Sequence, residues 1–210
     1  VIVEFQGVYG AGSPEIAAVL SSAAVDRAEA SLALPGRLAA GGVGFDIVVT
    51  LTDLEGSIWL PTLEAGSRSG GEGIILSRKA ATDLGVGPGD TVLLTHPRRT
   101  GPDSYGFGLA VVEVIGIHAA PYRFLAYMDT AQAEGMGLGG MVNRVNATPA
   151  PGQSLNEVKR SLFGMEAVSS VQPATVVADT FRDLIGRFIG LLQVVQIAVF
   201  LLALTIAFNS

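Results

Sequence analysis

The longest apolar stretch of the sequence lies at its C-terminal end. Residues 188–210 carry no charged side chain, and about 20 consecutive apolar residues are enough to cross a bilayer. The stretch therefore predicts part of a transmembrane helix, with lipid as its solvent. Its strongly polar members are amides, which in such helices often bond to a neighbouring helix: Gln193, Gln196 and Asn209. The alternative is a core helix of a soluble protein, which residues 1–187 would have to cover on every side.

An amphipathic turn directly precedes this stretch. Four large apolar residues recur there at helical spacing: Phe181, Leu184, Ile185 and Phe188. Asp183 lies four residues before Arg187, which is the favourable order for an ion pair on a helix. We expect one continuous helix over 179–210 that leaves a soluble domain as a stalk and enters the membrane. By the positive-inside rule alone, Arg182 and Arg187 would place this flank in the cytoplasm.

The beginning of the chain predicts a strand followed by a helix. Residues 1–8 read as a short strand. Ser13, Pro14 and Glu15 then supply an N-cap, a first-turn proline and a favourable acid. They lead into the helical run EIAAVLSSAA at 15–24.

A second unit of similar design is predicted over 141–175. Residues 142–148 read as a strand, and Ser154 with Glu157 forms a capping box at the start of a helix. One face of that helix is apolar: Leu155, Val158 and Leu162. Residues 168–171 read as the next strand. Two β-α-β units of this kind commonly build a small sandwich, so the fold class is predicted as α+β.

The middle of the chain, about 45–125, is predicted as a mainly β subdomain inserted between the two units. Three segments are rich in β-branched residues between turn signals: 45–53, 91–95 and 109–117. Residues 96–108 contain turn formers and charges, which predicts an exposed hairpin loop. Two glycine-rich segments, 66–73 and 135–140, are predicted as flexible connectors.

Charge and composition narrow the classes of partner. The formal net charge is −6, which repels a polyphosphate backbone, so nucleic acid is not an expected partner. The chain contains no cysteine, which excludes a disulfide framework and a thiolate metal site. It begins with Val1, and residues 1–20 lack the pattern of a signal peptide, so we expect a segment of a longer protein.

Histidine and glycine give no expectation of a metal or a cofactor. His96 and His118 border predicted strands, and there is no cysteine to complete a familiar zinc set with them. Four glycines imitate a dinucleotide-binding fingerprint, but no strand leads directly into them: Gly135, Gly137, Gly139 and Gly140. We interpret these glycines as a loop.

No catalytic residue is assigned, and the chain is not expected to be an enzyme. Ser67 and Ser69 lack the spacing and context of a nucleophile elbow. Asp83 and Asp90 bracket a glycine turn, where a helix-end acid and a turn acid are structurally expected. The sequence has no GxxxxGK[ST] phosphate-binding loop, so ATP hydrolysis is not expected in this chain.

One segment carries a family resemblance. Residues 71–94 read as a strand, a short helix capped by Ser77, a glycine-proline turn over Gly87 to Asp90, and a second strand. LPTLEAG precedes this segment and VVEVIGI follows it. With the second β-α-β unit and the apolar helix after it, the arrangement resembles the extracytoplasmic core of the MacB-like and FtsX-like ABC transporter permeases. The resemblance implies a core domain over 1–178 and a stalk with a partial transmembrane helix over 179–210.

The resemblance also implies partners and a location. Such a chain would be one part of a permease subunit in the cell membrane, with its globular domain on the extracytoplasmic side. A cytoplasmic ABC ATPase would drive its helices, and two permease subunits would form a homo- or heterodimer. Family members export small molecules or peptides, release lipoproteins, or regulate cell-wall hydrolases. Two alternatives stay open from the sequence: a membrane-tethered module that binds a ligand or a protein without an ATPase, and a soluble enzyme with a buried C-terminal helix.

Overall fold

The computed structural model describes residues 1–68, 72–101, 104–174 and 196. The chain divides into two compact units, Val1–Val171 and Gln172–Ser210. The helix predicted over 179–210 lies outside the described residues, apart from Gln196. In the part of the chain that is described, no helix combines the length and the apolar character needed to span a bilayer.

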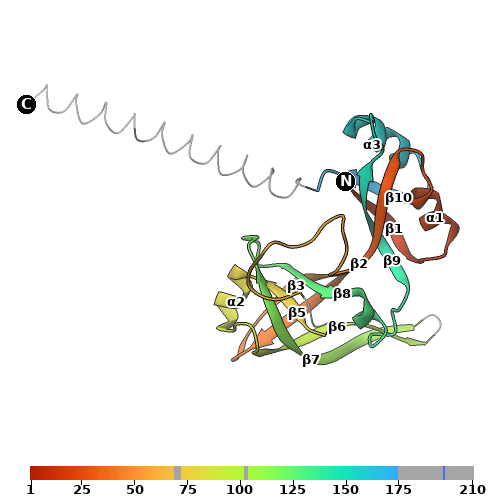
Figure 1. Cartoon of the computed structure of the whole chain (residues 1–210). Coiled ribbons are helices and arrows are strands. Elements are labelled where there is room, and N and C mark those ends of the chain that lie inside the picture. The colour runs from red at the N-terminus through yellow and green to blue at the C-terminus, as the bar shows by residue number, and fades with distance from the viewer. Residues whose placement is uncertain (69–71, 102–103, 175–195, 197–210) are drawn as a thin grey trace, which may run out of the picture. The chain divides into compact units, whose positions relative to one another are not determined.

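The described residues form a mixed α+β fold dominated by strands, as predicted (Figure 1). Its strands join in one ten-stranded sheet within the described ranges. In chain order, the elements are β1 (Ile2–Gly10), α1 (Pro14–Leu20), β2 (Val25–Ala40), β3 (Val43–Thr52), β4 (Leu63–Gly66), β5 (Ile74–Ser77), α2 (Arg78–Leu84), β6 (Thr91–Gly101), β7 (Ser104–His118), β8 (Leu125–Asp129), the 3₁₀ turn η1 (Thr130–Ala133), β9 (Met141–Pro149), α3 (Leu155–Phe163) and β10 (Val168–Gln172).

The first and last elements of the fold interleave. The strand order at this end of the sheet is β10-β1-β9-β2, so β1 and β2 enclose β9, and β9 and β10 enclose β1. Helices α1 and α3 share one apolar core with these strands. Its fully buried helical members are Ile16, Val19, Val158 and Leu162.

Both helices of this part begin where their caps predict. The Ser13 side chain accepts a hydrogen bond from the backbone N–H of Ile16, and Ser154 with Glu157 forms the predicted capping box. Helix α1 is shorter than predicted: it ends at Leu20, whereas the helical run was predicted to reach residue 24. The chain then turns into β2.

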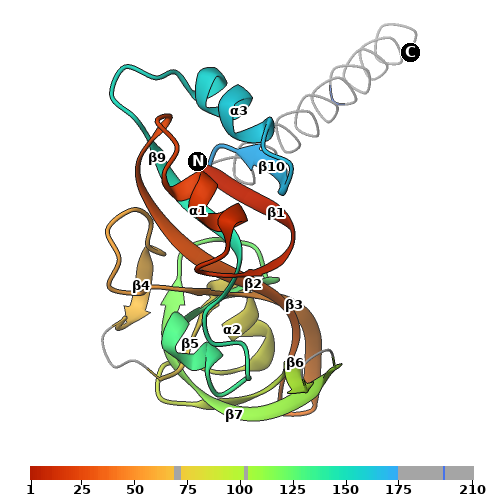
Figure 2. The ribbon, with the colours of Figure 1, turned by 90° about the vertical axis from the view of Figure 1, so that its right-hand side faces the viewer.

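Strand β2 was not predicted, although it is 16 residues long. Its first half pairs with β9, and its second half pairs with β3 on one side and β6 on the other. Figure 2 shows β2 passing from the part with β1 and β9 into the part with β3. Where the β9 ladder ends, the Asn143 amide continues it: Ala33 N–H donates to Oδ1 and Nδ2 donates to Ala33 C=O, both at 2.8 Å.

The middle of the chain closes into a small barrel. Strand pairings link β2, β3, β8, β5, β7 and β6 in turn, and β6 returns to β2. A closed ring has no free edges, and its interior is filled by an apolar core to which α2 contributes Ala80, Ala81 and Leu84. Ser77 caps α2 as predicted, and Gly85 ends it in the left-handed conformation with φ +67°.

The prediction of an exposed loop over 96–108 is wrong for most of its length. Strands β6 and β7 continue to Gly101 and Ser104, and their ladder pairs Pro97 with Phe107 and Arg99 with Tyr105. The segment is therefore the outer part of a long β-hairpin. The cause is cross-strand hydrogen bonding, which satisfies the backbone of a turn-rich sequence once its two halves face each other.

The glycine-rich segment 135–140 is a turn, but it is packed rather than a free connector. Met136 and Leu138 are buried in the barrel core. The backbone N–H of Arg99 donates to the carbonyl of Met136 at 3.1 Å. Gly137 has φ +70°, and a Cβ there would lie 3.1 Å from the Arg99 carbonyl oxygen. The turn therefore packs directly against the backbone of the hairpin.

A third apolar cluster surrounds His118, whose side chain is only 1% exposed. The Tyr127 ring lies 5.1 Å from the rings of both His118 and Trp59. The N–H of Ala120 donates to His118 Nδ1, so Nε2 carries the hydrogen and donates to the Leu125 carbonyl at 3.2 Å. Burial lowers the pKa of His118 below its ordinary 6.5 and raises the pKa of Tyr127 to about 12.

Replacing Asn143 by Ala is expected to lower the free energy of unfolding by about 1–3 kcal/mol, because the N–H and C=O of Ala33 lose their partners. Urea unfolding measures this change. Asn156→Ala on the surface of α3 is the matched control and should change stability by less than about 0.5 kcal/mol. Equal effects of the two substitutions would contradict the role of the Asn143 amide.

The neutral His118 ring predicts a pH dependence of stability. Because the folded pKa lies below the unfolded one, its contribution is complete above about pH 6.5 and is lost as the pH falls through the folded pKa. Unfolding free energies at pH 7 and pH 5 should therefore differ less for His118→Gln than for the wild type. Asn156→Ala, which removes no titratable group, serves as the control and should keep the wild-type difference.

Candidate functional site

The structure does not bring the residues considered from the sequence together in one site. His118 belongs to the buried aromatic cluster, whereas His96 lies on the inner face of the hairpin, with its ring over Gly108. Asp83 pairs with Lys79, whose hydrogen bond lowers the pKa of the carboxyl, and with Arg123 at 3.6 Å. Asp90 accepts a hydrogen bond from the N–H of Gly87 at 2.8 Å. Ser67 follows β4, and Ser69 lies outside the described residues.

Within the described ranges, no three histidine, aspartate or glutamate side chains gather as a metal site would require. The two histidines lie at separate positions in the barrel, one within β6 and one at the end of β7, and both of their rings bond to backbone carbonyl groups. A candidate binding site is therefore to be found on an exposed surface or in a cavity of the described residues.

An open pocket of about 650 Å³ lies between the hairpin and η1. Strand β7 contributes residues 110–113 to its wall, and η1 with the turn after it contributes Gln132 and Met136. The Gln132 side chain bonds to both backbone groups of Gly73, at 3.2 and 2.9 Å, and so holds the opposite wall in place. Pockets of this volume commonly accept small molecules.

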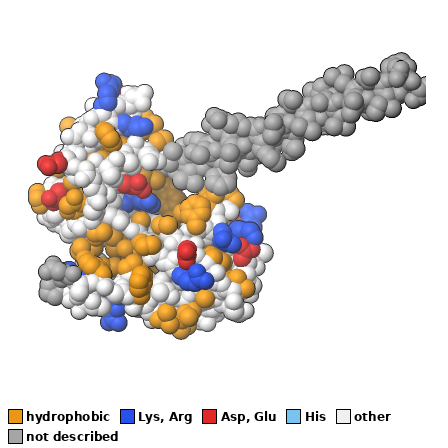
Figure 3. Space-filling view, turned by 180° about the vertical axis from the view of Figure 1, so that it is seen from behind, with side chains coloured by type: hydrophobic (Ala, Val, Ile, Leu, Met, Phe, Trp, Pro, Cys, Tyr) orange, Lys and Arg blue, Asp and Glu red, His pale blue; other side chains and the backbone are white. Residues whose placement is uncertain are grey.

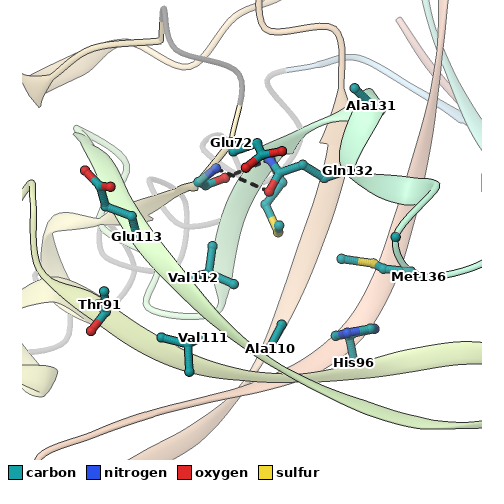
Figure 4. A pocket seen from close by; sticks show the side chains of 13 residues that line it. Glu72, Thr91, His96, Ala110, Val111, Val112, Glu113, Ala131, Gln132 and Met136 are labelled. Carbon is teal, nitrogen blue, oxygen red and sulfur yellow. Dashed lines mark hydrogen bonds between the residues drawn. The ribbon is translucent and has the colours of Figure 1, made fainter.

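The charges at this pocket have one sign. Glu72 and Glu113 line it, and no lysine or arginine is among the described residues that do so. Figure 4 shows these two glutamates toward one side of the pocket, and His96 with Met136 toward the other. The lining between them is largely apolar. Such a pocket is suited to a ligand with an apolar body and a cationic group.

The outer face of the hairpin is a second candidate site. Side chains alternate between the two faces of a strand. Most outward positions of β7 are apolar here, and with one residue of β6 they form what we call the hairpin face: Leu93, Tyr105, Phe107, Leu109 and Val111. Figure 3 shows hydrophobic side chains gathered beside the tip of the hairpin. Soluble monomers rarely expose a contiguous apolar surface of this kind, and it commonly marks an interaction site.

Neither site was predicted from the sequence. The hairpin face has a signal of period two, with large apolar residues at every second position from Tyr105 to Val111. The pocket has no such signal, because Glu72, Glu113 and Met136 come from three separate segments that only the closed barrel brings together.

Comparison with solved structures agrees with the fold predicted from the sequence. The extracellular domain of the noncanonical ABC-type transporter YknZ from Gram-positive bacteria matches 82% of this chain and 100% of its own, with 14% identity and a TM-score of 0.50. The periplasmic region of MacB from Actinobacillus actinomycetemcomitans matches 88% of this chain and 91% of its own, with 13% identity and a TM-score of 0.49. No protein-family model and no curated protein matches the sequence.

The likeness to YknZ extends over most of the described residues, including both the interleaved α+β part and the barrel. At this level of identity it establishes the fold. The chain therefore has the fold of the extracellular domain of an ABC-type transporter, as its resemblance to the MacB-like and FtsX-like permeases predicted.

Proposed function

We propose that this chain is the extracytoplasmic domain of an ABC transporter permease subunit. In this role it couples ATP-driven motion of membrane helices to substrate export, lipoprotein release or regulation of a partner. The observation that carries the proposal is the fold shared with the complete extracellular domain of YknZ. No catalytic role is assigned to the domain, and the proposal gives ATP hydrolysis to a cytoplasmic ATPase subunit.

The proposed arrangement in the cell membrane rests on the apolar C-terminal stretch and on the family resemblance. Residues 1–178 form the extracytoplasmic domain, and residues 179–210 form the stalk and part of a transmembrane helix in contact with lipid. The uncharged stretch 188–210 supports the membrane assignment. Two such subunits, identical or different, would share the ATPase.

The fold supplies a physical path for coupling. Strand β2 belongs to the ladder of β9 and to the barrel at the same time. A displacement of the interleaved part must therefore move the barrel or break backbone hydrogen bonds. The pocket and the hairpin face both lie on the barrel side of this connection, where a client or a partner would experience the motion.

The proposal predicts association with an ATPase. The full-length parent protein, purified in detergent from its native membrane, should retain an ABC ATPase subunit, and adding the parent to that ATPase should change its rate of ATP turnover. The control is the ATPase with an unrelated permease under the same conditions. A parent that neither retains an ATPase nor alters its turnover contradicts the transporter function.

The pocket favours a second candidate function, a membrane-tethered module that binds a ligand without an ATPase. The specific observation is the apolar cavity with Glu72 and Glu113 at its rim. This function does not require the parent to contain the further membrane helices of a permease. A binding measurement on the chain alone can therefore test it.

Tetraphenylphosphonium and tetraphenylborate have similar shapes and opposite charges, so they are suitable probes for the pocket. The chain has four methionines. Met128 and Met136 line the pocket, whereas Met141 and Met165 do not. With ¹³C-methyl methionine labels, the cation should shift the Met128 and Met136 signals, leave Met165 unchanged, and bind more tightly than the anion.

Glu72→Gln and Glu113→Gln should each weaken binding of the cation by about two- to fivefold, the range expected for one exposed charge pair. Glu166→Gln, an exposed carboxylate after α3 that does not line the pocket, is the matched control and should leave the affinity unchanged. Equal shifts with both probes, or shifts centred on Met165, contradict the selectivity for a cation in this pocket.

A further inference from the structure

The exposure of the hairpin face exceeds what a monomer in water would favour. Phe107 is 84% exposed, Val111 73%, Leu109 67% and Tyr105 59%. The other exposed large apolar residues of the described chain are scattered over other segments, and two of them, Leu155 and Phe163, lie at opposite ends of α3. Isolated apolar residues on a surface are ordinary, whereas a continuous row on one sheet face indicates a surface that is normally covered.

The size of the hairpin face matches one side of a protein interface. At about 150–250 Å² for each large side chain, the exposed parts add up to on the order of 500 Å² of apolar surface. A specific interface of standard size buries about 800 Å² on each partner, and roughly 65% of its fully buried part is apolar. The face is therefore large enough to form the apolar centre of such an interface.

Opposite charges lie at the two ends of the face. Cross-strand partners share one face of a sheet, so the register that pairs Arg99 with Tyr105 and Thr91 with Glu113 puts Arg99 at the distal end and Glu113 at the base. The two pairs are eight residues apart along the strand, or about 27 Å. The face thus carries a positive end, an apolar centre and a negative end.

We propose that the hairpin face binds the hairpin face of a second copy of this chain, with the two hairpins running in opposite directions. A two-fold arrangement of this kind brings the same patch together on both partners. It places the Arg99 end of one copy beside the Glu113 end of the other, whereas hairpins running in the same direction would bring like charges together. Two sheets packing face to face with aligned strands is a common arrangement.

The register of this contact follows from the pairing. Leu109 is the middle residue between Tyr105 and Glu113, so it faces Leu109 of the second copy. Phe107 then faces Val111, two positions to either side of the centre. A lipid surface is the less favoured occupant, because anionic headgroups complement only the Arg99 end, whereas a second copy running in the opposite direction complements both ends.

This inference deepens the proposed function, since it names a surface through which two permease subunits meet outside the membrane. Its test uses the 210-residue chain alone. If the hairpin faces do not bind each other, the proposed association with the ATPase can still hold. If the parent does not associate with an ATPase, the two hairpin faces can still bind each other.

Disulfide formation tests the register directly, because the native chain has no cysteine. Under mild oxidation, Leu109→Cys should form a disulfide-linked dimer at least about tenfold faster than Phe163→Cys, a control on the exposed surface of α3. A mixture of Phe107→Cys and Val111→Cys chains should form the mixed dimer faster than either variant links to itself. Adding Phe107→Asp to Leu109→Cys should remove most of the linking, because an aromatic side chain at the centre of an interface carries much of its binding energy.

Exchange of the end charges provides an independent test. Arg99→Glu and Glu113→Arg should each slow linking through Leu109→Cys, and the double exchange should restore it. Equal linking of Leu109→Cys and Phe163→Cys, or no rescue by the double exchange, overturns the proposal. Binding of a monomeric chain to anionic lipid vesicles that depends on Phe107 also overturns it, in favour of a lipid surface.

Discussion

The continuous hydrogen-bond ladder of β2 is the constraint on which the rest of the structure depends. Its residues 25–31 pair with β9 and its residues 32–40 pair with β3, so one strand sets the register of both parts of the fold. A shift by one residue would turn every side chain of the strand to its other face. Leu32 and Leu38 would then leave the barrel core, in which they are fully buried. The Asn143 amide secures the position at which the ladder changes partner.

The three short helices were predictable because their N-terminal caps depend on residues that are close together in the sequence. The caps at Ser13, Ser77 and Ser154 are side-chain contacts over three residues, so the sequence alone reveals them. The β-branched strands of the barrel were predicted for the same reason, because their propensity and their turns are local features. Their order in the sheet was not predictable, since it depends on closure of the ring between β6 and β2.

Strand β2 and the outer hairpin were missed because tertiary contacts override their local propensities. Residues 25–40 are rich in alanine and contain Pro35, which has no N–H to donate, yet pairing on both sides stabilises the strand. The glycines at 106 and 108 suggested a loop. In the structure they form the inner face of the hairpin, where Gly108 leaves room for the His96 ring. Small residues inside and large ones outside are therefore part of the same strand pattern.

The orientation of bonds in β2 has a mechanical consequence. Hydrogen bonds of an antiparallel ladder stand perpendicular to the strands. A pull along β2 therefore loads many bonds in shear at once, whereas a sideways pull would open them one after another. A tension directed along this strand would be carried with little extension, so the shared strand is well suited to serve as a stiff tie between the two halves of the domain.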